Sequence, residues 1–383
     1  MIITHARKIK TADPAAFAWA GLRKFQNVDQ VTRTLIDLHQ VPKRFHEDVR
    51  KQAQQIRYCL TQAREYFTAA SSVTTATQPN LLYYGTMSFA LAEILFKQDG
   101  MSSLDKAREE NRHHGLVMSM GDIPKNADLL TAARKLRARP HFMSGARRGT
   151  FELWHRSSRE PPLAGDITTN FENGTSTIAY NVIMTAIDKP YPPIPDNGLT
   201  FEDCLSGLPL MQEHLSLTTN ILGELIRGRV TSTVHRTEQW TQNIEVVLHP
   251  SPLYRELINS LSVPASYIDQ IDLQDGDDTG RIYMHSNWIS GHAPIPFPPA
   301  STVNTNEWRM WTNKPKLNEF GYHYVALYLA GNYARYFPDK WLSDVETSSP
   351  LALAIEELCA ISGWRVPWLA LSELDQTMYV SEA

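Results

Sequence analysis

The sequence predicts an α+β protein that is predominantly helical, and two observations carry this prediction. Apolar residues recur at spacings of three, four and seven in the first and last thirds of the chain, which is the period of amphipathic helices. The middle third instead holds short segments rich in β-branched and aromatic residues, bounded by Gly, Pro, Asn or Asp. We therefore expect a helical domain over residues 1–148, a mixed region over 149–315, and a C-terminal helical segment over 316–383 that packs back on the first domain.

Several helices are expected in the first domain. Residues 44–70 carry one apolar stripe, and residues 81–97 are apolar nearly all round, so the second of these helices should form the centre of the domain. A further helix is expected to end at Gly115, because glycine is typical of a helix C-terminus. Another should cover residues 126–139 and stop before the following proline.

The middle and last thirds complete the expected order of elements. Strands are predicted at residues 149–157, 175–183, 243–250 and 281–289, with Pro-rich loops around them and a helix or two at residues 201–217. Helical periodicity returns over residues 318–337 and 350–364.

Composition and charge restrict the function classes. The chain has 383 residues and 42% hydrophobic content, enough for a sizeable core. Lys plus Arg is 37 and Asp plus Glu is 41, so the formal charge of -4 excludes a whole-molecule field that would coat nucleic acid, and any anion binding must be local. Three separate cysteines, Cys59, Cys204 and Cys359, form no CxxC pair and are expected to be reduced core thiols of a cytoplasmic protein. No export signal or membrane span is predicted.

No cofactor or metal is expected. The sequence lacks the GxxxxGK[ST], GxGxxG, HExxH and GxSxG motifs. The acidic segment 272–278 lacks the ligand order of an EF-hand, although a weak cation site there stays open. Four histidines of the mixed region have no ligand spacing and are interpreted as structural: His235, His249, His285 and His292.

The first candidate site is the segment KAREENRHHGL at residues 106–116. A histidine with a pKa near neutral can take a proton from a ribose 2′-hydroxyl or give one to the leaving oxygen, and an arginine can stabilise charge on the phosphate. Arg108 lies five or six residues before His113 and His114, a little over one helical turn, so both could face one groove. One alternative is that the two histidines, with Arg112, are ordinary residues of a helix end before Gly115, and another is that the segment binds an acidic partner.

Two further segments are candidates for binding RNA. The first, residues 134–149, has six basic residues and no acid, which suits phosphate binding or else a solvated helix end: Arg134, Lys135, Arg137, Arg139, Arg147 and Arg148. The second, residues 332–341, places Arg335 and Lys340 among aromatic residues that could stack on a nucleotide or form core.

Three segments together resemble the YaaC-like family. They are residues 63–95, in which a tyrosine-bearing helix precedes an LLYYG helix, HHGL at 113–116, and YLAGNYARYFPDKWL at 328–342. The anchors are spread over about three quarters of the chain, and nothing matches from about residue 160 to 310. The resemblance implies a cytoplasmic bacterial protein, of a family with members beside defence or mobile-element genes.

The helical part is also similar to the HEPN group, many of whose members are ribonucleases with an Arg-x4-6-His motif. Arg108 fits this motif with His113 at four intervening residues and with His114 at five. Glu109 departs from it, because Asn or another polar residue is more typical after the arginine.

The expected function is a component of a bacterial defence or toxin-type system that binds or cleaves RNA at a metal-independent Arg/His site. Its expected partners are RNA, a protein of the same defence system, and a second copy of the chain that supplies the facing wall of the groove. The alternative is a non-catalytic scaffold or sensor subunit that pairs with a separate effector through its basic and aromatic surfaces.

Overall fold

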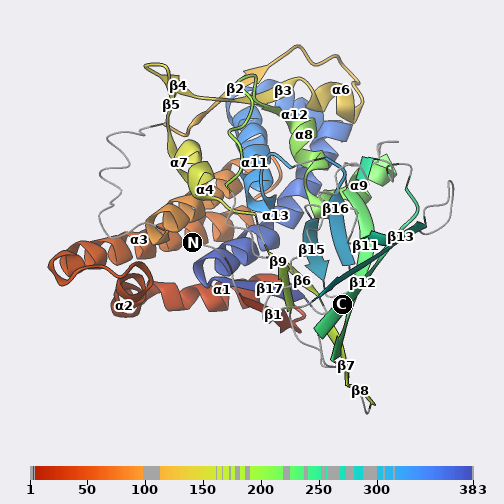
Figure 1. Cartoon of the computed structure of the whole chain (residues 1–383). Coiled ribbons are helices and arrows are strands. Elements are labelled where there is room, and N and C mark those ends of the chain that lie inside the picture. Colours follow the sequence, from red (N-terminus) through yellow and green to blue (C-terminus); the bar gives the residue numbers. More distant parts are fainter. Residues whose placement is uncertain are drawn as a thin grey trace.

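The computed structural model confirms the α+β class, with helices from both ends of the chain forming most of the molecule (Figure 1). It describes residues 3, 5–97, 113–160, 162–165, 167–171, 174–176, 182–185, 190–218, 225–236, 240–251, 253, 256–257, 268–272, 280–287, 300–304, 307–313 and 315–381. No helix within these ranges is long and apolar enough to cross a membrane.

Among the described residues, the N-terminal body contains α1 (Pro14–Leu22), α2 (Val28–His39), α3 (His46–Ala70) and α4 (Gln78–Phe96). α3 buries the predicted apolar stripe. α4 is buried on nearly every side, as its composition predicts, and even its Glu93 is 1% exposed. A helix that is apolar on every side must be covered by other elements, and α3, α7 (Thr150–Ser157) and the C-terminal helices cover α4.

The C-terminal helices pack back on this body, as predicted. They are α11 (Glu319–Tyr336), α12 (Pro338–Glu346) and α13 (Pro350–Leu374). α11 and α13 both contact α4, and α13 also contacts α1. Aromatic pairs mark these contacts, with ring centroids 5.3 Å apart for Phe17 and Trp368, and 5.8 Å apart for Tyr83 and Tyr324. Both ends of the chain therefore contribute to one hydrophobic core.

A sheet, with ten strands within the described ranges, lies beside the helices (Figure 1). Its main path follows β1 (His5–Ile9), β17 (Thr377–Ser381), β15 (Ala300–Asn304), β16 (Glu307–Trp311), β11 (Leu225–Arg236), β12 (Trp240–Leu248), β14 (Gly280–Asn287) and β13 (Ile268–Asp272). β7 (Ile167–Phe171) joins β11, and β8 (Gly174–Ser176) joins β7. β12 and β14 confirm two predicted strands, whereas the parallel pairing of the chain ends through β1 and β17 had no sequence signal.

A smaller layer covers one end of α11. It contains the three-stranded sheet of β2 (Leu116–Met120), β3 (Leu136–Pro140) and β10 (Leu199–Thr200), and the hairpin of β4 (Phe142–Met143) and β5 (Ala146–Arg147). Short helices connect it: α6 (Leu129–Ala133), α7 (Thr150–Ser157), α8 (Phe201–Ser206) and α9 (Gln212–Thr218). α8 and α9 confirm the helices predicted at 201–217. β6 (Leu163–Gly165) pairs with β9 (Val182–Thr185). The strand predicted at 175–183 overlaps β8 at its start and β9 at its end, and its residues 177–181 lie outside the described ranges.

The strand predicted at residues 149–157 is wrong, because the segment forms helix α7. Its aromatic residues favoured a strand by propensity. In the structure Phe151, Trp154 and His155 are buried at helical spacing of three and four, so the packing against the core decides the conformation.

The helix predicted at residues 126–139 is also wrong in its second half. Asp128 caps α6 by accepting a hydrogen bond from the Thr131 amide, but the helix ends at Ala133. The next residues form β3, in which Leu136 and Ala138 are buried and alternate with Arg137 and Arg139. This period of two is the signal of a strand pairing with β2 and β10.

Candidate functional site

The two adjacent histidines lie in a bend directly before β2, not in a helix. The predicted helix runs from Ser102 or Ser103 to Gly115, and its residues up to 112, with Arg108 and Arg112, lie outside the described part of the chain. His113 and His114 are both exposed, and Gly115 has a φ of +88°. The described part of the segment is therefore a glycine turn that presents two imidazoles at the surface.

The first turn of α7 holds this bend in place. The Thr150 amide donates to the His113 carbonyl and the Phe151 amide to the His114 carbonyl, each at 3.0 Å. These amides belong to the helix N-terminus, where backbone donors have no partner within the helix. The His141 amide completes the frame by donating to the Gly115 carbonyl at 3.0 Å.

Gly149 makes this close approach of two backbones feasible. It has a φ of +117°, and a Cβ added there would lie 2.2 Å from the Gly115 Cα and 2.3 Å from the Gly115 nitrogen. Only glycine meets both the conformational and the spatial requirement. The position of His113 and His114 thus depends on a pair of glycines 34 residues apart in sequence.

Tyrosines from two core helices cover one edge of the His114 ring. The Tyr83 hydroxyl lies 2.9 Å from the His114 Nδ1, and the Met87 sulfur lies 3.4 Å from the same nitrogen. Tyr328 of α11 approaches the ring with centroids 6.5 Å apart, and its hydroxyl donates to the Leu116 carbonyl at 2.9 Å. α4 and α11 therefore fix both the imidazole and the start of β2.

Arg335 joins this group from the end of α11. Its Nη1 donates to the Tyr84 hydroxyl at 2.6 Å, and the Tyr84 ring lies 6.2 Å from the His114 ring. The guanidinium also lies over the exposed Tyr336 ring at 5.1 Å. The structure thereby brings together His114 and Arg335, which the sequence placed in two separate candidate segments.

The pKa of His114 lies below the usual value of a histidine. Burial of its Nδ1 edge disfavours the imidazolium, and the charges of Arg335 and His113 act in the same direction. The imidazole is therefore neutral at neutral pH, while the neighbouring guanidinium keeps its positive charge.

A third histidine completes the surface. The rings of His113 and His141 lie 4.5 Å apart between centroids. Within the described chain, the buried Nδ1 of His141 has no hydrogen-bond partner. Three imidazoles and one guanidinium, from His113, His114, His141 and Arg335, thus surround the glycine bend. We refer to these four residues with Tyr83 and Tyr84 as the histidine cluster.

Several residues of the predicted basic segment bind acids or a carbonyl of the protein itself. Arg134 donates to both carboxylate oxygens of Glu202, at 2.6 and 2.9 Å, and Arg147 pairs with Asp196. Arg137 donates to the Asn197 carbonyl at 3.3 Å. These contacts lower the local excess of positive charge that the sequence indicates.

The remaining predicted binding residues occupy three places. Lys135 and Arg139 are exposed, and Arg139 stands opposite Val117 where β3 pairs with β2. Arg148 is half-buried beside the β4–β5 hairpin, and its amide donates to the His141 carbonyl. Lys340 is exposed on α12. The aromatic side chains of its segment are divided, since Tyr333 and Trp341 are core while Tyr336 is exposed.

Sequence reasoning missed Tyr83, Tyr84 and His141 as site residues. Tyr83 and Tyr84 precede His114 by about thirty residues and belong to a helix whose composition predicts core. The only signal in the sequence is that two adjacent tyrosines stand on a largely apolar helix, where at least one hydroxyl is expected to lie at the edge of the buried face. No spacing rule connects them with a histidine on a later loop.

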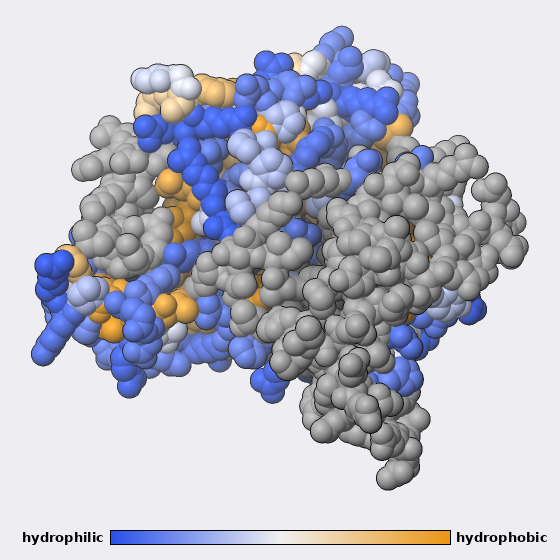
Figure 2. All heavy atoms as spheres, in the orientation of Figure 1, coloured by the Kyte–Doolittle hydropathy of each residue, from blue (hydrophilic) through white to orange (hydrophobic). Residues whose placement is uncertain are grey.

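An apolar tip projects near the histidine cluster. Phe142 and Met143, at the β4–β5 hairpin, are 46% and 41% exposed, and Val117 is 45% exposed. Figure 2 shows the hairpin as a pale to orange tip beside a largely hydrophilic face. Single exposed apolar residues are ordinary, but Phe142 and Met143 are adjacent in this hairpin, so its tip presents apolar surface to solvent.

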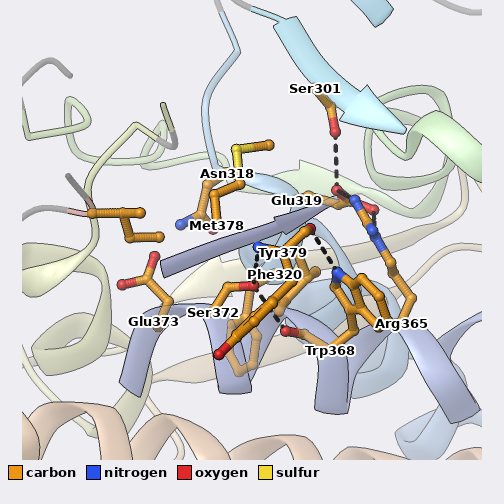
Figure 3. A pocket seen from close by; sticks show the side chains of 12 residues that line it. Ser301, Asn318, Glu319, Phe320, Arg365, Trp368, Ser372, Glu373, Met378 and Tyr379 are labelled. Carbon is orange, nitrogen blue, oxygen red and sulfur yellow. Dashed lines mark hydrogen bonds and ion pairs between the residues drawn. The ribbon is translucent and has the colours of Figure 1, made fainter. Parts of the chain in front are cut away.

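A pocket between α11, α13 and β17 is a weaker candidate (Figure 3). Its cavity measures about 50 Å³, whereas ligand sites usually measure roughly 300–1,000 Å³. Its polar side chains bind one another: Arg365 donates to both oxygens of Glu319 at 2.7 Å, and the Trp368 indole donates to the Tyr379 carbonyl at 3.0 Å. We interpret this pocket as part of the structural core. Among the described residues, no group of three or more His, Cys, Asp or Glu could hold a metal ion.

Comparisons with known proteins place the chain in a family. No curated protein and no solved structure matches it. The model of the family described as YaaC-like Protein matches residues 23–374, which include α2 to α4, α11 to α13 and the histidine cluster, while α1, β1 and β17 lie outside the match. The match confirms the resemblance carried by the LLYYG, HHGL and YLAGNYARYF segments, and the chain belongs to the YaaC-like family.

Proposed function

We propose that this protein binds single-stranded RNA at the histidine cluster and cleaves it there without a metal ion. The observation that carries the proposal is the meeting of His114 and Arg335, linked through Tyr84 and accompanied by the exposed His113. The likeness of the helical part to the HEPN group, and a role in bacterial defence or as a toxin, belong to the same proposal.

The residues of the cluster suit this chemistry. The exposed Arg335 guanidinium offers charged donors for a phosphate, and Tyr336 beside it offers a ring on which a base can stack. An unprotonated imidazole can accept the proton of the ribose 2′-hydroxyl. The proposal also includes Arg108, which lies outside the described residues.

In the proposed reaction the 2′-oxygen forms a bond to phosphorus and the bond from phosphorus to the 5′-oxygen breaks. The 2′-hydroxyl proton passes to an imidazole, and the leaving 5′-oxygen takes a proton from solvent. The products are a 2′,3′-cyclic phosphate and a 5′-hydroxyl end, so the step needs no oxidant, reductant or further reactant.

Cleavage of labelled RNAs of varied sequence in the presence of EDTA tests this proposal. The wild-type chain is expected to cleave, and the double variant His113→Ala/His114→Ala is expected to lose at least about a hundredfold in rate, the usual contribution of a general acid or base. The variant His39→Ala is the matched control, because His39 lies on α2 and binds the Phe96 carbonyl. Inactivity of the wild type on every RNA, or activity of the double variant equal to that of the wild type, would contradict the catalytic proposal.

The second candidate function is a non-catalytic scaffold that pairs with an effector protein. The observations that favour it are the apolar tip of Val117, Phe142 and Met143, and the pairing of Arg134 and Arg147 with acids. This alternative predicts the same binding of an effector by the wild type and by the double histidine variant.

A further inference from the structure

We infer that Tyr83 fixes His114 in the tautomer that carries its proton on Nε2, which makes the neutral imidazole a hydrogen-bond donor for a phosphate group. The assignment of the tautomer stands on the described contacts alone. The phosphate as acceptor rests on the proposed function.

The Tyr83 hydroxyl keeps its proton. The residue is 2% exposed, and its pKa lies above the usual value because burial disfavours the phenolate and the neighbouring phenols Tyr324 and Tyr328 repel its charge. A buried hydroxyl that retains its proton needs an acceptor.

The His114 Nδ1 is the strongest acceptor within reach of this hydroxyl. It lies 2.9 Å from the Tyr83 oxygen, whereas the Met87 sulfur lies 3.9 Å from that oxygen and is a weak acceptor. The same sulfur lies 3.4 Å from Nδ1 and could accept from a protonated Nδ1, but a thioether is a weaker partner for this nitrogen than the phenol at 2.9 Å. Tyr324 contributes to the raised pKa of Tyr83 through its charge and a side-chain hydrogen bond, but the Tyr324 oxygen has no partner at hydrogen-bonding distance and angle among the described residues, so it is the poorer acceptor. Tyr83 therefore donates to Nδ1.

This hydrogen bond decides where the imidazole proton lies. A neutral histidine has one donor and one acceptor nitrogen, so an Nδ1 that accepts leaves the proton on Nε2. Within the described chain, nothing bonds to Nε2 of His114, and the residue is exposed. The Nε2 hydrogen is thus available, and the Arg335 guanidinium is held nearby through Tyr84, whose ring lies 6.2 Å from the His114 ring, so the two groups can donate to one anion.

The assignment separates the roles of the two adjacent histidines. A neutral His114 with its proton on Nε2 presents no lone pair to a ligand, so it cannot accept the 2′-hydroxyl proton at that atom. The exposed His113 is then the group that accepts this proton, while His114 and Arg335 hold the phosphate. Tyr83 is a positioning residue, since it acts on the ligand only through His114.

Two-bond 1H–15N correlation spectra of the histidine rings near neutral pH test the tautomer directly and need no RNA. In the wild type, the His114 Nε2 should appear protonated and the Nδ1 unprotonated, with the resonances assigned by their loss in His114→Gln. Tyr83→Phe should shift both nitrogens towards the averaged values of two exchanging tautomers. The control Tyr66→Phe, which removes a half-buried hydroxyl from the ring that stacks on Tyr84, should leave them unchanged.

Each outcome of this experiment is decisive. A wild-type His114 with its proton on Nδ1 overturns the inference, even if Tyr83→Phe fails to fold. Addition of inorganic phosphate should shift the wild-type Nε2 resonance, and an unchanged resonance at saturating phosphate overturns the donor role. Because these spectra contain no RNA, a failure of cleavage leaves the tautomer assignment standing, and a failed tautomer assignment leaves the cleavage assay to be judged by itself.

Discussion

Two buried glutamates of the helical core differ in charge because their neighbours differ. Burial favours the neutral form of Glu319, but the charge and two hydrogen bonds of Arg365 outweigh it, and the pKa of Glu319 lies below the usual value. Burial also acts on Glu93, where Lys97 compensates less at 3.8 Å and Glu373 adds repulsion, so the pKa of Glu93 rises to about 8. At neutral pH Glu319 is therefore ionised, whereas Glu93 is largely protonated.

The raised pKa of Glu93 predicts a pH dependence of stability. The folded state keeps a proton on Glu93 at pH values where the unfolded carboxyl, with a pKa of 4.5, has lost it. This contribution to stability is complete below about pH 4.5 and is lost as the pH rises through about 8. Histidines with lowered pKa values, such as His323 at about 4, act in the opposite direction below the usual histidine pKa.

The variant Glu93→Gln isolates the effect of this one carboxyl. Glutamine keeps an oxygen to accept the hydrogen bond that Trp154 donates to Glu93 at 2.8 Å, and it cannot ionise. Urea unfolding at several pH values should show that the stability of the variant relative to the wild type increases from about pH 4.5 to about pH 8. A constant difference across this range would show that Glu93 does not carry a raised pKa.

At the scale of elements, the histidine bend depends on α7 more than on its own sequence. The amides of Thr150 and Phe151 hold the carbonyls of His113 and His114, and Gly149 allows the two segments to touch. The helix N-terminus therefore determines where the imidazoles lie.

Two glycine substitutions should have opposite effects on stability. Gly149→Ala should destabilise the fold by at least about 1–3 kcal/mol, because its φ of +117° is unfavourable for alanine and the Cβ would overlap Gly115. Gly363→Ala, within α13 and with nothing within 4 Å of the new Cβ, should stabilise it by about 0.5–1 kcal/mol. Chemical denaturation of both variants measures the difference, and equal stabilities would refute the close contact of Gly149 with Gly115.

The long helices could be predicted from sequence, but the site could be predicted only in part. α3 has clear periodicity, whereas α4, α11 and α13 are long segments that are apolar on nearly every side. α7 and β3 are short, and a few residues of local pattern do not distinguish a helix from a strand. Tertiary contacts determine which of the two conformations each segment adopts. His114 and Arg335 were found through their chemistry, yet their contact through Tyr84 spans 251 residues between Tyr84 and Arg335, and local pattern gives no access to it.

At the scale of the whole molecule, the two ends of the chain share one core. α4 is enclosed by α3, α11 and α13, and Phe17 of α1 packs on Trp368 of α13. The predicted boundary at residue 315 therefore separates segments that bury each other's apolar surfaces.

Removal of the C-terminal helices should abolish folding of the remainder. A chain ending at residue 315 would expose the face of α4 that packs on α11 and α13, where Tyr83 contacts Tyr324 and Tyr328. We expect this chain to show no cooperative thermal transition by circular dichroism, whereas the full chain shows one. A cooperative transition of the truncated chain would mean that residues 1–315 fold independently.

Because the net charge is -4, the proposed binding of RNA would depend on a few local groups. Arg335 is exposed beside His114, whereas Arg134 is paired with both oxygens of Glu202. The two arginines therefore form a matched pair for testing where RNA binds.

The most direct test is the affinity for a fluorescently labelled single-stranded RNA, measured by anisotropy at constant salt. Loss of a charged hydrogen bond to phosphate costs about 1.5–3 kcal/mol, so Arg335→Ala should weaken binding by about tenfold or more. Arg134→Ala should bind nearly as the wild type does. Unchanged affinity of Arg335→Ala, or a larger loss in Arg134→Ala, would contradict the placement of RNA at the histidine cluster.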